Sequence, residues 1–195
     1  GHLDNLLPRR SKVQKVKHHA ALHYKEAPEF VRTLRAVDSI AARALEFLIL
    51  TGSRTGEVVA AKWKEIDFAQ KVWTIPAERM KAGREHRVPL APQTIELLKK
   101  VGEAGRDSPY HEGVYVFQNV RSSTHLSNMA MLALLNRLGR TEITVHGFRS
   151  TFKDWASEQT TFSREVSEMA LAHTISDKVE AAYRRGDLFS KRRSL

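Results

Sequence analysis

Between two stretches of helical pattern the chain reads Leu50-Thr51-Gly52-Ser53-Arg54-Thr55-Gly56-Glu57-Val58. The stretch before it predicts a helix over residues 39–50 with Asp38 as its N-cap, because apolar residues recur on one helical face: Ile40, Ala44, Leu45, Leu48 and Ile49. Thr51-Gly52 ends this helix, since glycine readily takes the left-handed conformation found just past a helix end. A further helical stretch over residues 55–62 makes Arg54 and Glu57 neighbours, because they are three positions apart.

This Arg54–Glu57 pair has two interpretations. The segment is rich in glycine and hydroxyl residues, but it lacks Gly-Lys-Ser/Thr, which excludes a nucleotide P-loop. Spacing alone favours an exposed ion pair of little energetic value. In the functional interpretation, Glu57 holds the guanidinium fork of Arg54 toward a phosphate.

The periodicity on either side of this segment predicts the fold class. A helix begins at Ala27, and beyond residue 62 three short strands are expected over 66–68, 72–75 and 87–90. Another helix runs from Pro92 to residue 100, and residues 114–117 form a short extended segment. Later helices are expected to begin at Ser127, at Thr144 or His146, at Ser163 and at Asp177. The chain is therefore expected to be mainly α with a small three-stranded antiparallel β-sheet.

Composition limits the class of partner. The chain has 195 residues, of which 42% are hydrophobic, enough to bury a core. Its 32 Lys and Arg against 22 Asp and Glu give a formal net charge of +10, which favours a polyanion such as nucleic acid. The longest apolar run, residues 47–50, is too short to span a bilayer. The absence of cysteine excludes thiol nucleophiles and zinc–thiolate sites, and agrees with a cytoplasmic location.

The N-terminal residues differ in composition from the rest. Residues 8–25 contain six Lys or Arg and no acid, a pattern typical of a solvated segment. We expect residues 1–25 to be a basic linker to a missing N-terminal domain, and residues 26–195 to form the main folded domain. His19 and His23 have the spacing of a metal pair on a helix, but no carboxylate or thiol joins them, so we expect no metal site and no cofactor.

Six residues suit metal-free attack on a phosphodiester: Arg54, Lys81, His146, Arg149, His173 and Tyr183. Arginines neutralise a phosphate, a histidine or lysine moves protons, and a tyrosine hydroxyl attacks. Taken singly, each has a structural explanation. His146 and Arg149 share a face at a helix start, and His173 could complement a helix C-terminus. Tyr183 could be a packing residue, and Lys81 a solvated turn residue between the last two strands.

The order and spacing of the six resemble the catalytic domain of tyrosine recombinases, the phage-type integrase family, and above all the integrases of phages and genomic islands. The resembling stretches are residues 50–58, Trp73-Thr74-Ile75-Pro76-Ala77-Glu78-Arg79-Met80-Lys81, His146-Gly147-Phe148-Arg149, Leu171-Ala172-His173 and Ala182-Tyr183. The resemblance implies the DNA breaking-rejoining fold and site-specific recombination through a 3′-phosphotyrosyl intermediate. It also implies a nucleophilic Tyr183, a supporting Glu57, and catalytic roles for the other five residues.

The resemblance further implies double-stranded DNA attachment sites as partners and a DNA-dependent tetramer when full length. The isolated domain is expected to be a monomer without membrane contact, in a bacterial cytoplasm and associated with the nucleoid. Basic residues proposed to contact DNA are Arg84, Arg87, Arg121, Arg140, Lys153 and Arg184. Two alternatives stay open: type IB topoisomerase-like strand passage, and a non-catalytic DNA-binding integrase remnant.

Overall fold

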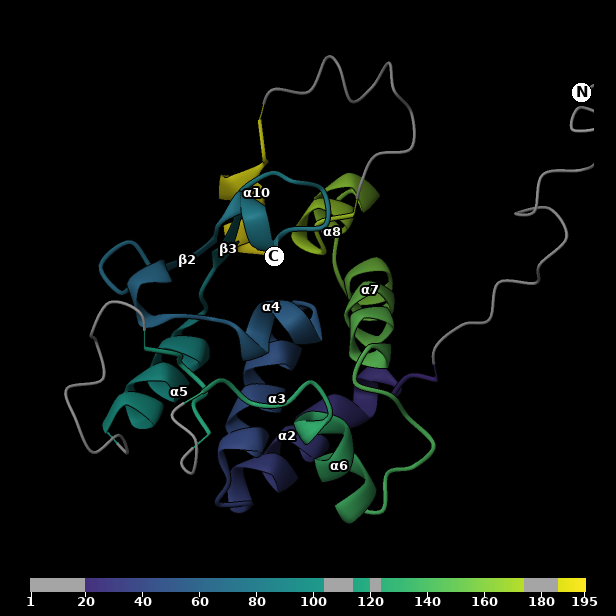
Figure 1. Ribbon diagram of the computed structural model, residues 1–195. Coiled ribbons are helices and arrows are strands. Elements are labelled where there is room, and N and C mark those ends of the chain that lie inside the picture. Colours follow the sequence, from purple (N-terminus) through teal and green to yellow (C-terminus); the bar gives the residue numbers. More distant parts are fainter. Residues whose placement is uncertain (1–19, 104–113, 120–123, 174–185) are drawn as a thin grey trace, which may run out of the picture.

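The computed structural model describes residues 20–103, 114–119, 124–173 and 186–195 (Figure 1). Its helices are η1 (Tyr24–Glu26), α2 (Ala27–Ala36), α3 (Ile40–Thr51), α4 (Thr55–Val59), η2 (Trp63–Glu65), η3 (Ala77–Arg79), α5 (Pro92–Glu103), α6 (Ala130–Arg137), α7 (Gly147–Gln159), α8 (Arg164–Ala170) and α10 (Phe189–Ser194). The strands are β1 (Ile66–Asp67), β2 (Val72–Ile75) and β3 (His86–Pro89). The helix expected from Asp177 to residue 185 lies outside the described residues.

The three strands form one antiparallel sheet in the order β1-β2-β3, which confirms the predicted fold class. Ile66 pairs with Trp73 between β1 and β2, and Ile75 pairs with His86 between β2 and β3. The prediction for β3 was wrong by one residue, because the pairing begins at His86 rather than Arg87. The loop between β2 and β3 carries Lys81, as predicted.

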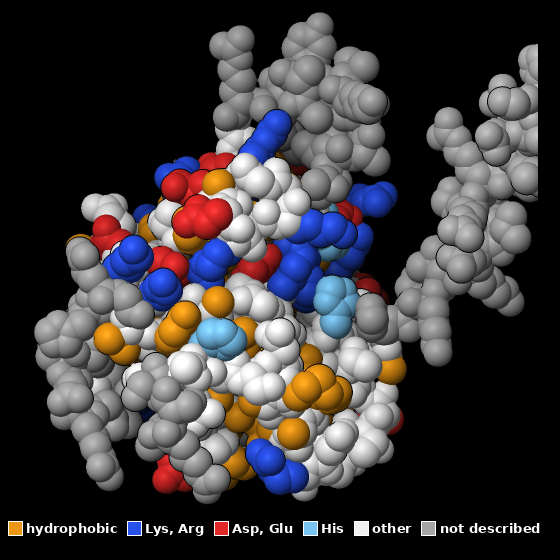
Figure 2. Space-filling model, viewed as in Figure 1, with side chains coloured by type: hydrophobic (Ala, Val, Ile, Leu, Met, Phe, Trp, Pro, Cys, Tyr) orange, Lys and Arg blue, Asp and Glu red, His pale blue; other side chains and the backbone are white. Residues whose placement is uncertain are grey.

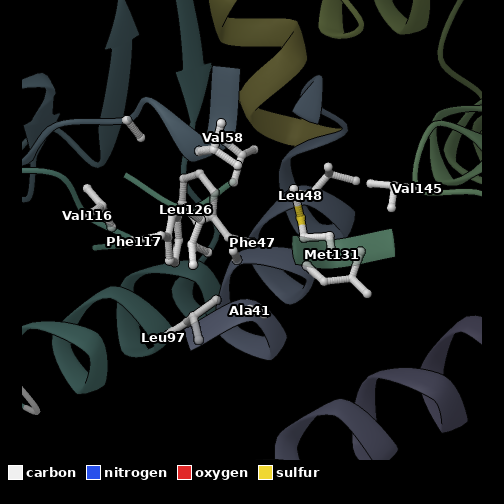
Figure 3. Close-up of a cluster of buried hydrophobic side chains, with 14 of the residues drawn as sticks. Ala41, Phe47, Leu48, Val58, Leu97, Val116, Phe117, Leu126, Met131 and Val145 are labelled. Carbon is white, nitrogen blue, oxygen red and sulfur yellow. The ribbon is translucent and has the colours of Figure 1, made fainter. Parts of the chain in front are cut away.

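Helix α3 lies at the centre of the helical part of the molecule and packs against α2, α5, α6 and α7 (Figure 1). The side chain of Phe47 meets Trp73 of β2 at a ring-centroid distance of 5.1 Å and Phe117 at 5.3 Å. Figure 3 shows Phe47 among side chains from several other segments, including Val58, Leu97 and Met131. The contact of Phe47 with Trp73 therefore attaches the sheet to the helices.

Several predicted helix boundaries need correction, and one of them is the end of α5, which continues to Glu103 rather than stopping at residue 100. The N-cap of α3 is Ser39 rather than Asp38, because the Ser39 hydroxyl accepts from the backbone N–H of Ala42. Helix α4 ends at Val59 rather than residue 62, because the next residues pair with residues 114–116 instead. Helix α6 begins at Ala130, because the Ser127 hydroxyl accepts from Met129 and forms a turn ahead of the helix.

Residues 20–25 pack against the start of α7. Leu22 is buried, and its carbonyl accepts from the hydroxyl of Thr151 at 2.6 Å. The carbonyl of Ala20 accepts from the backbone N–H of Thr144 at 3.0 Å. Gly147 permits this approach, since an added Cβ would lie only 2.1 Å from the Ala20 oxygen. The folded part of the chain therefore includes residues that composition assigned to the linker.

Helix α10, which the sequence pattern did not predict, packs against β3 and α8. Arg192 is 4% exposed and donates to the carbonyls of Arg87 and Asp187 and to the Asp187 carboxylate. Arg87 binds the same carboxylate through two nitrogens, and its guanidinium lies over the ring of Phe189. Within the described ranges, no helix is both long and apolar enough to cross a membrane.

Candidate active site

Arg54 stands at the N-cap of α4, where Glu57 holds it from two directions. One carboxylate oxygen of Glu57 accepts from the Arg54 backbone N–H at 2.7 Å, and the other accepts from Nη1 at 2.8 Å. Glu57 is 5% exposed, so this is a mostly buried pair rather than the exposed pair that spacing alone favours. The second guanidinium nitrogen, Nη2, donates to the carbonyl of Ala172 at 3.1 Å.

Arg149 lies in the first turn of α7 and is 4% exposed. Its Nη1 donates to the carbonyl of Gly52 and its Nη2 to the carbonyl of Leu171, whereas the buried Nε has no hydrogen-bond partner. Burial and, to a lesser extent, the neighbouring charge of Arg54 together lower the pKa of Arg149 to about 10. Arg149 is therefore a buried cation held close to a second cation.

The two arginines meet at the turn that follows α8. Ala172 takes a left-handed conformation with φ of 49°, which turns the chain out of the helix and directs successive carbonyls toward the arginines. Arg149 binds the Leu171 carbonyl and Arg54 binds the next one, that of Ala172. His173 is the following residue, so the same turn brings three of the six sequence-predicted residues together.

His173 is hydrogen-bonded through Nδ1 to the carboxylate of Glu168. Glu168 also binds Lys153 of α7 and, at 3.4 Å, Arg164. Burial raises the pKa of Glu168, but hydrogen bonds from Lys153 and His173 outweigh it and hold that pKa at about 2. The sequence analysis did not single out Glu168. Its position five residues before His173, in the helix that leads to that histidine, was the available signal.

His146 is exposed at the N-cap of α7, and its carbonyl accepts from the backbone N–H of Arg149. The first N–H of the helix is capped by Thr144, whose hydroxyl accepts from Gly147 at 3.0 Å. Of the two residues predicted to begin this helix, Thr144 supplies the capping hydroxyl. His146 occupies the N-cap position and has its side chain at the surface, at the start of the helix that carries Arg149.

Lys81 is exposed in the loop between η3 and β3. Within the described part of the chain, it makes no hydrogen bond or ion pair with the two arginines. Tyr183 lies outside the described residues, so its role is argued from sequence alone. The geometry thus brings Arg54, Glu57, Arg149 and His173 together, and puts His146 at the start of the same helix as Arg149.

His86 is a second residue that sequence reasoning missed. Its pKa is lowered to about 4, mainly by burial and then by the charge of Arg192, against the opposing effects of Glu57 and a hydrogen bond to the backbone of Ala170. It therefore lies within electrostatic range of Arg54 and Glu57. Alternation along β3 was the available signal, since Val88 and Leu90 are buried and His86 shares their face.

The proposed DNA-contact residues differ in their surroundings. Arg87 is paired with Asp187, Lys153 with Glu168, and Arg140 with Glu142 and more distantly Glu26. Arg84 is exposed and has no such carboxylate partner among the described residues, whereas Arg121 and Arg184 lie outside them. Figure 2 shows Lys and Arg side chains gathered across the middle of one face, with histidines among them.

The fold is that of tyrosine recombinase catalytic domains. The crystal structure of XerA recombinase aligns with a TM-score of 0.63 at 16% identity, covering 90% of this chain and 64% of that chain. A lambda integrase (75–356) dimer bound to a COC′ core site aligns with a TM-score of 0.61 at 18% identity, covering 89% of this chain and 62% of that one. At these identities the likeness concerns the fold alone.

Sequence comparison identifies the family. The model of the Phage integrase family matches residues 20–187. Prophage integrase IntZ of Escherichia coli (strain K12) is 33% identical over 186 residues, which cover 94% of this chain and 45% of IntZ. Prophage integrase IntA of the same strain is 32% identical over 176 residues, which cover 87% of this chain and 41% of IntA. The chain belongs to the phage integrase family, and spans less than half the length of these curated relatives.

Proposed function

We propose that this chain is the catalytic part of a site-specific DNA recombinase, which integrates or excises a phage or genomic island by metal-free strand cleavage and rejoining. One observation carries the proposal: Arg54 and Arg149, far apart in sequence, donate to consecutive carbonyls of the turn before His173. Family membership supports the same activity.

The electrostatics of the paired arginines favour an anion. Arg54 lowers the pKa of Arg149, because two cations in proximity destabilise each other's charged form. Glu57 offsets part of this repulsion, since it acts in the opposite direction on Arg149. A phosphodiester bound beside both guanidinium groups would offset more of it, and charge building on the transition state would strengthen the interaction.

The proposed reaction follows from these roles. The Tyr183 hydroxyl attacks the scissile phosphorus, and its proton passes to His146. The bond from phosphorus to the 5′ oxygen breaks, and Lys81 protonates the departing oxygen. Arg54, Arg149 and His173 hold the non-bridging oxygens of the phosphate. A 5′-hydroxyl from a second strand then attacks the 3′-phosphotyrosyl bond and releases the tyrosine, so no net hydrolysis occurs.

Trapping on a nicked suicide duplex tests the nucleophile. The unaltered chain is expected to form a covalent adduct, and mass spectrometry should locate the linked residue at Tyr183. Tyr183→Phe should form no adduct, while its DNA affinity in a gel-shift titration stays close to that of the parent. Adducts formed by Tyr183→Phe would overturn the proposal. Tyr115→Phe, which alters a tyrosine paired with the Lys62 segment, is the matched control.

Partners follow from the same proposal. A lambda integrase tetramer bound to a Holliday junction aligns with this chain with a TM-score of 0.63 at 17% identity. By analogy, we infer that the full-length protein assembles as a tetramer on its attachment sites at the bacterial nucleoid, and that the isolated domain is a monomer. Size-exclusion chromatography with and without a site duplex tests the assembly.

Relaxation of a supercoiled plasmid that lacks any attachment site would instead favour a topoisomerase.

A further inference from the structure

We propose that Glu168 is a positioning residue for the recombination reaction, holding the imidazole of His173 in one tautomer and one orientation toward the scissile phosphate. This inference rests on the proposed function, because it assigns Glu168 a role through His173. Glu168 was not among the residues that the sequence pattern or the family resemblance singled out.

The contacts of Glu168 are divided between its two oxygens. Oε2 binds Nδ1 of His173, whereas Oε1 binds Nζ of Lys153 and, at 3.4 Å, Nε of Arg164. The side chain is only 23% exposed, which limits competition from water. A backbone hydrogen bond joins the same two residues, since the N–H of His173 donates to the carbonyl of Glu168 at 3.0 Å. His173 is therefore held to Glu168 by both ring and backbone.

The charge of Glu168 determines which ring nitrogen carries hydrogen. With a pKa of about 2, this carboxylate is ionised at neutral pH and can only accept hydrogen bonds. Nδ1 of His173 must therefore donate, and Nε2 becomes the nitrogen that can meet a phosphate oxygen or exchange a proton. Without the carboxylate, the ring could rotate or adopt the other tautomer.

Lys153 connects this arrangement to the arginines. It belongs to α7, the helix whose first turn carries Arg149, and its bond to Glu168 joins α7 to α8. The Glu168 charge also raises the pKa of Arg149, which places the carboxylate within electrostatic range of the phosphate-binding pair. One carboxylate thus relates the positions of His173 and Arg149.

The tautomer of His173 can be measured, and it should not change on substitution of Glu168 if that residue only stabilises the fold. In long-range ¹⁵N–¹H spectra of the whole chain, His173 should appear protonated at Nδ1. Glu168→Leu, which removes the acceptor and keeps a side chain of similar bulk, should convert this signal to a tautomer mixture. Glu168→Gln, which keeps one acceptor oxygen, should have an intermediate effect. His125, whose Nδ1 lies 2.7 Å from the carbonyl of Leu126, is an internal reference that should not change.

Cleavage kinetics give the second readout. Glu168→Leu should slow adduct formation on the suicide duplex by about tenfold to about a hundredfold, a part of what a general acid–base group contributes. Its DNA affinity should change by less than about threefold, because Glu168 is an anion and is not among the residues proposed to contact the phosphates of DNA. Glu165→Gln is the matched control, since it removes the same charge from an exposed position on the same helix. It should leave the rate and the His173 signal unchanged.

The outcomes separate the two proposals. An unchanged His173 tautomer and an unchanged cleavage rate in Glu168→Leu would overturn the role of Glu168 and leave the recombinase assignment standing. Slow cleavage with an unchanged tautomer would also overturn it, because Glu168 would then act by another route. Adducts formed by Tyr183→Phe would overturn the recombinase mechanism itself, whatever the Glu168 variants do.

Discussion

Arg54 and Arg149 donate to adjacent backbone carbonyls, Arg54 to Ala172 and Arg149 to Leu171. One arginine comes from the N-cap of α4 and the other from the first turn of α7, so a single turn after α8 fixes the distance between them. Arg54 also binds Glu57, and Arg149 also binds the Gly52 carbonyl. Both guanidinium groups are therefore held in place before any ligand binds. Preorganised donors of this kind are the largest single contribution to stabilising charge in many active sites.

Arg54→Lys tests whether this geometry matters beyond charge. A single ammonium cannot reach both Glu57 and the Ala172 carbonyl as the guanidinium does. We expect single-turnover cleavage to slow by about 10²–10³-fold. Arg32→Lys is the control, because Arg32 forms the same i, i+3 pair with Glu29 on an exposed surface. A lysine variant as fast as its parent would show that only the charge is required.

His86 should make stability depend on pH. Its folded-state pKa of about 4 lies below the unfolded value near 6.5, so the unfolded chain binds more protons between these values. The free energy of unfolding should therefore fall as pH drops from about 6.5 to about 4, by up to about 3 kcal/mol. His86→Gln should flatten the curve in this window in urea titrations. Equal slopes for both proteins would contradict the lowered pKa of His86.

Two glycines should respond to alanine in opposite directions. Gly147→Ala would place a Cβ 2.1 Å from the Ala20 oxygen, a backbone atom, and should lower the free energy of unfolding by more than about 2 kcal/mol. Gly56→Ala has open space around its Cβ and lies within α4, so it should raise stability by about 0.5–1 kcal/mol. Thermal unfolding measures both, and a tolerated Gly147→Ala would show that residues 20–21 do not pack as described.

The carboxylate of Asp187 should control the attachment of α10. Burial raises its pKa, but Arg87 and Arg192 outweigh burial and lower the pKa overall, so the group stays charged at neutral pH. Asp187→Asn loses the charge that both arginines bind. Amide hydrogen exchange over residues 189–194 should accelerate by roughly tenfold or more, the equivalent of one weakened charged hydrogen bond. Lys191→Ala, at an exposed position on α10, should leave the exchange unchanged.

Local patterns predicted most elements, and tertiary contacts decided where several of them end. The apolar period of α3 and the alternation of β2 depend on near neighbours, so both were correctly predicted. Helix α4 stops early because residues 61–63 pair with residues 114–116, which no local pattern reports. Helix α10 has no apolar stripe of its own. It is held by Arg192 and Phe189 against β3, a contact between distant parts of the chain.

The sequence by itself determined the chemical inventory: a basic chain without cysteine, with two arginines, two histidines, a lysine and a tyrosine in a fixed order. It also determined the helix period and the strand alternation, because these arise from residues a few positions apart. Only the tertiary structure decided that Arg54 and Arg149 bind one turn, that Glu168 holds His173, and that His86 lies half-buried nearby. Those relationships join residues from separate elements, and packing alone sets the distances between elements.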